Sequence, residues 1–436
     1  MKKVLIITYY WPPSGGPGVQ RVLKFAKYLP QFGWQPIILT VKHGEYPAID
    51  KSLKKDIPPE CKVYKTDSFE PSVLYRKFTG MKAGEKIPVA NLSQKNVSWK
   101  KKISNWIRLN LFVPDAKIGW IPYAVKEGKK IIKEEQPDII FSSSPPPTVH
   151  LIAKKLAKWS GIKWVSDFRD PWTDIYHYDK VKRSNFALVK DLKLERNVLK
   201  RADEIVTASK HIGVYLLKDN FPEKSVKVIT NGFDEDDFSG LINNSPTKKF
   251  ILSYAGKINY QQNPVNVWKS LQELKEEFPS LESDLKIFLM GNITPDVLKS
   301  ISSFNLSANL KYPGYVTHSE MLMHLNASDL LLLLIPNTKK NISIIPGKIF
   351  EYLATGKRII GIGPENGNSA EILIETSAGK MFEFDEVNRL KNEILNQYQL
   401  WMKGQNQGID KEIIQNFTRK ELTRKLVDIF NKNTPT

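Results

Sequence analysis

The sequence predicts an α/β protein with two domains, each built on its own parallel sheet. Short apolar segments alternate with amphipathic helical stretches along the whole chain, and this alternation is typical of parallel α/β units. The composition, 41% hydrophobic and 25% charged, is that of a soluble globular protein. One hydrophobic core rarely fills 436 residues, so the length favours two domains.

Short apolar runs bounded by turn residues are the candidate strands. In the first half they are Val4–Thr8, Pro36–Leu39, Ile139–Ser142, Lys163–Val165, Glu204–Thr207 and Lys227–Ile229. In the second half they are Phe250–Tyr254, Lys286–Met290, Leu330–Ile335 and Arg358–Ile362. The polar segment Asp236–Lys249 separates the two sets. We therefore expect an N-terminal domain over 1–235, a C-terminal domain over 236–417, and a final helix and tail over 418–436 that can pack back on the N-terminal domain.

The proline-punctuated, lysine-rich stretch 42–120 predicts helical insertions on the first domain. Within it, the segment 99–112 places Trp99, Trp106 and Phe112 near helical spacing, with basic residues between them. A basic helix with an aromatic face suits the plane of an anionic membrane. The alternative is an ordinary helix that docks on its own domain through the two tryptophans.

Charge is distributed unevenly between the two halves. Residues 1–235 contain 42 lysines and arginines against 24 acidic residues, whereas residues 236–436 contain 23 against 22. This excess predicts an anionic partner for the first half: nucleic acid, an acidic membrane face or a phosphorylated substrate. The single cysteine, Cys61, excludes an intramolecular disulfide and fits a reducing compartment. With six histidines and no Cys/His cluster, a structural zinc site is not expected.

The apolar runs of the sequence indicate neither a signal peptide nor a membrane-spanning helix. The apolar run at Met1–Thr8 is too short for a signal peptide, and Tyr9–Pro13 interrupts it where a cleavage site would be needed. The longest apolar run, Leu330–Ile335, is far shorter than the roughly 20 residues that span a bilayer. We expect a cytoplasmic protein or one that is peripheral on the inner face of the membrane.

Three segments of the first half carry candidate site residues at predicted strand ends, where open α/β sheets bind their ligands. The loop after the first strand contains Gly15 and Gly16, which let the backbone approach a phosphate or a sugar. The turn after the third strand and the Asp-Phe-Arg-Asp-Pro-Trp segment supply polar side chains. We take Arg169 and Asp170 as catalytic candidates, and Ser144, His150 and Asp167 as acceptor-side candidates. Asp167 and Arg169 could instead form a structural ion pair.

The second half contains the most informative segment, residues 346–363. Pro346 suits a first helical turn, and a glycine ends the helix before an apolar strand. Lys348 and Glu351 share one face near the positive end of this helix, which suits a ligand with phosphate and ribose hydroxyls. The helix start also offers backbone N–H groups, and Lys257 lies at the end of that half's first strand. The alternative is a surface helix on which Lys348 and Glu351 merely pair.

These motifs, taken in order, resemble the GT-B glycosyltransferases of family 4 over nearly the whole chain. The resemblance implies an α/β GT-B fold: two Rossmann-like domains facing each other across a cleft. It also implies a retaining, metal-independent glycosyltransferase that needs no cofactor beyond its nucleotide-sugar co-substrate. By this resemblance Glu351 holds the ribose, Lys257 neutralises the leaving diphosphate, and Gly16 approaches the donor phosphates. Gly15, Gly347 and Lys348 complete the donor-binding set.

Two departures from the family pattern affect donor recognition. Family members often carry a second glutamate eight positions before the ribose-binding one, where this chain has Ser343. Their second basic residue falls among Gln261, Gln262 and Asn263, and Lys348, Lys339 or Lys340 could replace it. The expected acceptor is a lipid-linked or cell-surface saccharide, with an anionic membrane as a further partner. An epimerase-like enzyme of the same fold is the first alternative, and a basic nucleic-acid-binding protein is the second, although no nucleic-acid module is recognised.

Overall fold

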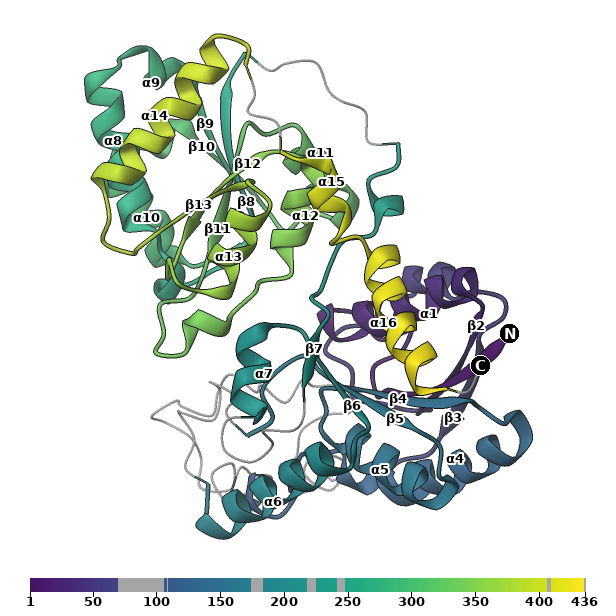
Figure 1. Ribbon diagram of the computed structural model, residues 1–436. Coiled ribbons are helices and arrows are strands. Elements are labelled where there is room, and N and C mark those ends of the chain that lie inside the picture. Colours follow the sequence, from purple (N-terminus) through teal and green to yellow (C-terminus); the bar gives the residue numbers. More distant parts are fainter. Residues whose placement is uncertain are drawn as a thin grey trace. The chain divides into compact units, whose positions relative to one another are not determined.

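The structure is a computed structural model, and it describes residues 1–69, 106–107, 109–173, 183–217, 225–240, 248–405 and 409–434. The chain forms two compact units, of which the first comprises Met1–Thr230 with Leu422–Thr436 and the second comprises Asn231–Glu421. Figure 1 shows that each unit is a central sheet covered by helices. In the described part of the chain, no helix combines the length and the apolar character needed to cross a bilayer.

The first unit contains a parallel sheet in the order β3-β2-β1-β4-β5-β6-β7. Its strands are β1 Lys2–Ile7, β2 Trp34–Val41, β3 Lys62–Thr66, β4 Ile139–Ser144, β5 Trp164–Phe168, β6 Glu204–Thr207 and β7 Val226–Val228. Its α-helices in the described ranges are α1 Pro17–Tyr28, α4 Ile121–Glu135, α5 Thr148–Ser160, α6 Asn185–Arg201, α7 Lys210–Leu217 and α16 Arg419–Asn433. The order reverses between β1 and β4, as in doubly wound folds.

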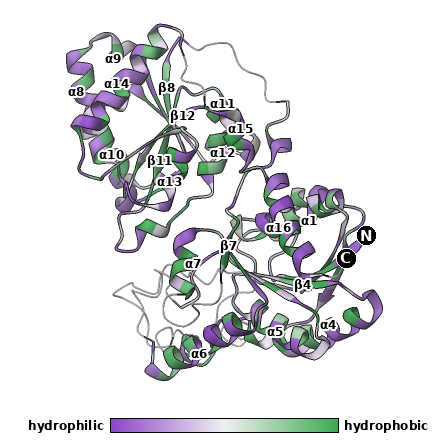
Figure 2. Ribbon diagram, viewed as in Figure 1, coloured by the Kyte–Doolittle hydropathy of each residue, from purple (hydrophilic) through white to green (hydrophobic). Residues whose placement is uncertain are grey.

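The strands of this sheet are apolar on both faces because helices cover both. Leu5 and Ile7 of β1 pack in one core with residues of α4, α5, α6 and α7. Val4 and Ile6 point the opposite way, into a core shared with α1 and α16. This explains why the sequence shows near-continuous apolar runs rather than alternation. Figure 2 shows hydrophobic residues gathered on the central strands.

The second unit repeats the design with the order β10-β9-β8-β11-β12-β13. Its strands are β8 Phe250–Ile258, β9 Leu285–Ile293, β10 Leu310–Gly314, β11 Leu330–Leu334, β12 Arg358–Ile362 and β13 Gly379–Phe382. Its α-helices in the described ranges are α8 Val265–Glu277, α9 Ser280–Asp284, α10 Pro295–Ser303, α11 His318–Asn326, α12 Lys348–Thr355, α13 Asn368–Glu375, α14 Asn388–Met402 and α15 Lys411–Gln415. Its sheet is also buried on both faces, between two apolar cores.

The predicted strands are all present, and the structure adds three that the sequence did not indicate: β3, β10 and β13. All three are edge strands, and β3 and β10 carry exposed lysines. The prediction of helical insertions over 42–120 is therefore wrong at β3, which is a strand of the main sheet. Trp99 and most of the predicted basic helix lie outside the described residues.

The division between the units falls after Thr230 rather than after residue 235. The reason is local: Phe233 forms a bridge with Thr418, and its carbonyl accepts from the backbone N–H of Arg419 at 2.7 Å. This short pairing ties the polar segment after Thr230 to the second unit. The final helix packs on the first unit, where the Phe430 ring lies 5.2 Å from Trp34 and 5.7 Å from Phe141.

Candidate functional site

The carboxyl ends of β8 and β11 form the topological switch point of the second sheet. Parallel α/β sheets bind ligands at such a point, because the loops on either side of it run in opposite directions and leave room between them. Here the loops that follow the two strands are joined, since the Asn337 N–H donates to the Gln261 carbonyl at 2.8 Å. The residues predicted to bind a donor in this unit come from these two strand ends: Lys257 lies at the end of β8, and Gly347, Lys348 and Glu351 follow β11.

Helix α12 begins at this edge and points its first turn outward. Gly347 is the N-cap and is exposed, and the helix ends at Gly356, whose φ of 68° is left-handed. Its apolar side chains, including Phe350 and Leu353, are fully buried. Burial of that face fixes the helix, so its N-terminus presents the exposed Gly347 and two charged side chains.

Lys348 is held by an aromatic residue of β8. Its Nζ donates to the Tyr254 hydroxyl at 2.7 Å and lies 3.9 Å from the centre of the Tyr254 ring. Burial lowers the pKa of Lys348 to about 7, while the nearby charge of Glu351 acts in the opposite direction. An amine with this pKa takes up a proton readily when an anion binds nearby. The Tyr254 hydroxyl in turn donates to the Lys257 carbonyl at 2.9 Å, which links the two candidate lysines.

Gly256 makes room for the Lys348 ammonium. A Cβ added at Gly256 would lie 2.5 Å from the Lys348 Nζ. The φ of this residue is 131°, which side-chain-bearing residues rarely adopt. The backbone conformation therefore favours glycine at position 256, and any larger residue would displace the Lys348 ammonium.

Glu351 lies on the same helix but has a different partner. Its Oε1 is 3.0 Å from the Nε2 of His318, at the start of α11. Both side chains are partly or largely exposed. The simple alternative, a Lys348–Glu351 surface pair, is thus replaced by two separate contacts, Lys348–Tyr254 and Glu351–His318. Neither Tyr254 nor His318 was identified from the sequence, because nothing in their local context marks them.

The segment before α12 carries Ser343 where family members often have a glutamate. This residue lies in a short helical turn, Asn341–Ser343, and is partly buried. The turn is attached to the start of α13, since the Ser369 hydroxyl donates to the Ile344 carbonyl at 2.8 Å. Lys339 is exposed in the preceding loop. The loop therefore brings a hydroxyl and a lysine to the same sheet edge as α12.

In the first unit, the glycine loop after β1 leads directly into α1. Gly16 is the N-cap of α1, with φ 88°, and it is exposed. Gly15 is covered instead: its N–H donates to the Ala48 carbonyl, and an added Cβ would lie 3.0 Å from Asp50. Of the two glycines, Gly16 is the one whose backbone a ligand can reach.

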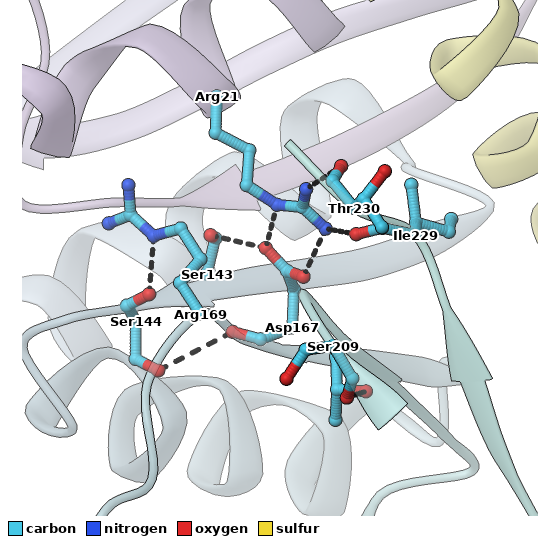
Figure 3. A network of polar contacts seen from close by, with 9 residues as sticks. Arg21, Ser143, Ser144, Asp167, Arg169, Ser209, Ile229 and Thr230 are labelled. Atoms are coloured by element: carbon cyan, nitrogen blue, oxygen red, sulfur yellow. Dashed lines mark hydrogen bonds and ion pairs between the residues drawn. The ribbon is translucent and has the colours of Figure 1, made fainter. Parts of the chain in front are cut away.

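A buried polar network lies behind this loop (Figure 3). Arg21 of α1 donates to both carboxylate oxygens of Asp167 on β5, at 2.9 and 2.8 Å. The Ser143 hydroxyl donates to the same carboxylate at 2.6 Å. Arg21 also donates to the Ile229 and Thr230 carbonyls, at 2.8 and 2.7 Å. The network joins α1 and β5 to the last residues of the first unit.

This network corrects the assignment of Asp167 as an acceptor-side residue. Asp167 is fully buried, and the Arg21 side chain that pairs with it is 1% exposed. A direct contact with an acceptor is therefore excluded. The alternative, a structural ion pair between Asp167 and Arg169, is half correct: Asp167 is in a structural ion pair, but its partner is Arg21. Local sequence patterns could not predict this pairing, since the two residues are 146 positions apart.

The Arg169 guanidinium donates hydrogen bonds to backbone carbonyls rather than to a carboxylate. Its guanidinium donates to the carbonyls of Ser144 and Pro145, and to that of Gly18 in α1 at 2.6 Å. Burial lowers the pKa of Arg169 from its usual value. These contacts make Arg169 a clamp between the glycine loop and the end of β4. Asp170, the next residue, is exposed at the carboxyl end of β5.

His150 and Ser144 are buried as well. His150 is 0% exposed, and its Nδ1 is 2.8 Å from the Ser142 hydroxyl. Burial lowers the pKa of His150 to about 3, so this imidazole is neutral at physiological pH. Ser144 is 4% exposed. A direct acceptor contact is excluded for His150, and the side chain of Ser144 has little surface to offer.

The start of α5 is already occupied by a carboxylate. Asp115 accepts from the backbone N–H of Thr148 at 2.8 Å and from its hydroxyl at 2.9 Å. The proline-rich turn therefore offers no open helix N-terminus to an anion. Across the described residues, no group of three or more histidine, cysteine, aspartate or glutamate side chains is arranged to hold a metal ion.

The comparisons with known proteins agree on the fold. The model of Glycosyltransferase Family 4 matches residues 94–237. This match confirms the resemblance to family 4 in the first unit. No curated protein sequence matches the chain significantly.

Solved structures with the same architecture cover nearly the whole chain. A glycosyltransferase from Rickettsia africae is 18% identical with a TM-score of 0.60, over 99% of this chain and 98% of its own. Anabaena HepE in complex with UDP-glucose is 13% identical with a TM-score of 0.59, over 99% and 100%. S. aureus TarM, solved with UDP and saccharide ligands, is 11% identical with a TM-score of 0.56, over 99% and 100%. The fold is GT-B: two Rossmann-like α/β domains with parallel sheets.

Proposed function

We propose that this protein is a glycosyltransferase that takes its sugar from a nucleotide-sugar donor. The observation that carries the proposal is the start of α12, where Lys348 and Glu351 lie beside the exposed Gly347 at the switch point of the second sheet. A nucleoside diphosphate needs a cation for its phosphates and a carboxylate for its ribose hydroxyls. The family match and the donor-bound structure of HepE support this choice of ligand.

The two lysines have separate roles in the proposal. Lys257 is exposed and meets the diphosphate directly, whereas Lys348 leaves the Tyr254 ring to join it. Lys348 thus replaces the basic residue that family members have near Gln261–Asn263. Cations at the diphosphate stabilise the charge that develops as the glycosidic bond breaks. Arg169 acts by holding the start of α1 behind Gly16, and Asp170 is an exposed acid at the carboxyl end of β5.

The acceptor side of the proposal rests on charge. The first half of the chain holds almost all of the net charge of +19, which suits a phosphorylated or membrane-borne saccharide acceptor. We propose transfer with retention of configuration, without a metal, to a lipid-linked or cell-surface polysaccharide acceptor by a cytoplasmic enzyme that is peripheral to the membrane. Family resemblance supports retention and the absence of a metal.

Calorimetry with uridine diphosphate and a panel of other nucleoside diphosphates tests the donor site. We expect Glu351→Ala to weaken binding at least about tenfold by removing a ribose contact. Glu375→Ala, at the far end of α13, is the matched control and should leave the affinity unchanged. His318→Ala removes the protein partner of Glu351 but keeps the carboxylate, so binding should persist.

Unchanged affinity in Glu351→Ala would overturn the assignment of the ribose contact. A thermal-shift screen of nucleotide-sugars then identifies the donor, because a ligand that binds only the folded state raises its stability. Conversion of a nucleotide-sugar in the absence of any acceptor would identify an epimerase-like activity and refute the transfer reaction.

A further inference from the structure

Helix α6 is anchored to the first unit along one side. Ser184 caps its N-terminus by accepting from the Ala187 N–H, and Ala187, Val198 and Leu199 are buried against the unit. These contacts are sufficient to fix the helix. The remaining surface of α6 is therefore available without any change in the fold.

That surface is unusually apolar at the start of the helix. Phe186 is 71% exposed, Val189 64% and Leu192 41%. The spacing of these three residues places them on one outward side of α6. Isolated exposed apolar residues are ordinary, but several of them on one helix turn toward solvent indicate a binding surface.

A second segment, 74 positions earlier in the chain, extends the same surface. The Asn110 side chain accepts from the backbone N–H of Ser184 at 2.6 Å, and Arg183 donates to the Leu109 carbonyl at 3.3 Å. These bonds hold the segment at the start of α6. Trp106 and Leu111 of this segment are 54% and 57% exposed. Two elements thus converge to present large apolar side chains.

The charges on α6 are sorted by sign. Its two acidic side chains are turned inward: Asp191, 1% exposed, pairs with Arg183 at 2.8 Å, and Glu195, 5% exposed, accepts from the Thr173 hydroxyl. Its exposed charged side chains are basic, namely Lys193, Arg196, Lys200 and Arg201. These basic residues follow the exposed apolar residues along α6, so the helix surface is apolar at its N-terminal part and basic beyond it.

We propose that α6 together with residues 106, 107 and 109–111, here called the α6 surface, docks on an anionic lipid bilayer. The apolar side chains enter the interface, and the basic side chains contact the lipid phosphates. A second copy of the chain is a poor occupant, because an isologous pairing would place these cations against one another. The inference rests on the proposed function in one respect: a membrane-borne acceptor gives the docking its purpose.

Sedimentation with vesicles tests the proposal on the full chain. Vesicles of phosphatidylcholine mixed with phosphatidylglycerol should bind the protein, and vesicles of phosphatidylcholine alone should bind it much less. Phe186→Ser with Val189→Ser, and separately Lys193→Glu with Arg196→Glu, should each weaken binding at least about tenfold. The matched controls lie on α4, whose exposed residues Tyr123, Lys126 and Lys133 allow Tyr123→Ser and Lys126→Glu with Lys133→Glu. These controls should bind as the wild type does.

Equal loss in the α4 charge control would show that net charge alone acts and would overturn the α6 assignment. Undiminished vesicle binding by the α6 variants, or a change in their oligomeric state instead, would overturn it as well. Calorimetry with uridine diphosphate separates this proposal from the previous one. Normal donor binding by α6 variants that no longer sediment supports both, and vesicle binding by a protein that binds no nucleoside diphosphate leaves only the α6 surface standing.

Discussion

The most demanding prediction concerns the buried pair Arg21–Asp167, which we perturb with Asp167→Asn. The substitution preserves shape and leaves an amide oxygen that can accept one hydrogen bond. It removes the negative charge that faces a guanidinium only 1% exposed, at 2.8 Å from the carboxylate. The Ser143 hydroxyl also loses a charged acceptor.

The expected cost follows from this geometry. With an effective dielectric constant of about 20, two unit charges about 4 Å apart attract each other by about 4 kcal/mol. Removing one member of a buried pair generally costs about 3–5 kcal/mol, because the remaining charge stays buried without compensation. The Ile229 and Thr230 carbonyls still accept from Arg21 and offset part of the loss. We therefore expect a loss of about 3 kcal/mol of local stability.

Hydrogen exchange at the amides of β4 and β5 measures this loss within the first unit alone. Because 1.4 kcal/mol corresponds to a factor of ten, exchange through opening of these strands should accelerate about a hundredfold or more. Glu134→Gln, which breaks the exposed Lys130–Glu134 pair on α4, is the control and should change stability by less than about 0.5 kcal/mol. Acceleration by less than fivefold in Asp167→Asn would refute the claim that this pair holds the network together.

Three further predictions test the site and its surroundings. Affinity for uridine diphosphate should fall by up to about tenfold per pH unit as the pH rises above about 7, because Lys348 loses its proton there. The Lys348→Arg variant should show a flatter pH profile. A wild-type profile that is flat from about pH 6 to about pH 9 would contradict the role of Lys348. Gly256→Ala should weaken the affinity for uridine diphosphate at least about fivefold by displacing Lys348. The control Gly404→Ala, at a residue with φ 65° and open space around it, should lower stability but not this affinity. Calorimetry measures the two affinities, and equal values would contradict the prediction. His150 has a pKa of about 3 in the folded state against 6.5 in the unfolded state, so its contribution to stability is full above pH 6.5. That contribution is lost as the pH falls toward 3, by up to about 1.4 kcal/mol per pH unit. Urea unfolding of His150→Phe should show a weaker pH dependence between pH 3 and 6.5, and an unchanged dependence would contradict this prediction.

Local sequence patterns were sufficient for the architecture. Alternating apolar strands and amphipathic helices predicted both sheets because each strand is covered on both faces, which demands continuous apolar runs such as Leu330–Leu334. The start and stop signals around α12 were equally local, so a helix ending at Gly356 was predicted correctly. Edge strands such as β10 escaped prediction because exposed edges tolerate lysine and proline.

The sequence by itself determined the two-sheet fold, the uneven distribution of charge and the position of Lys348 and Glu351 at a helix start, because these depend on residues close together in the chain. Only the tertiary structure decided the partners. Lys348 meets Tyr254 from 94 positions away, and Asp167 meets Arg21 rather than its neighbour Arg169. A buried charge is paired by whichever group the fold brings to it, and that choice depends on packing between distant elements.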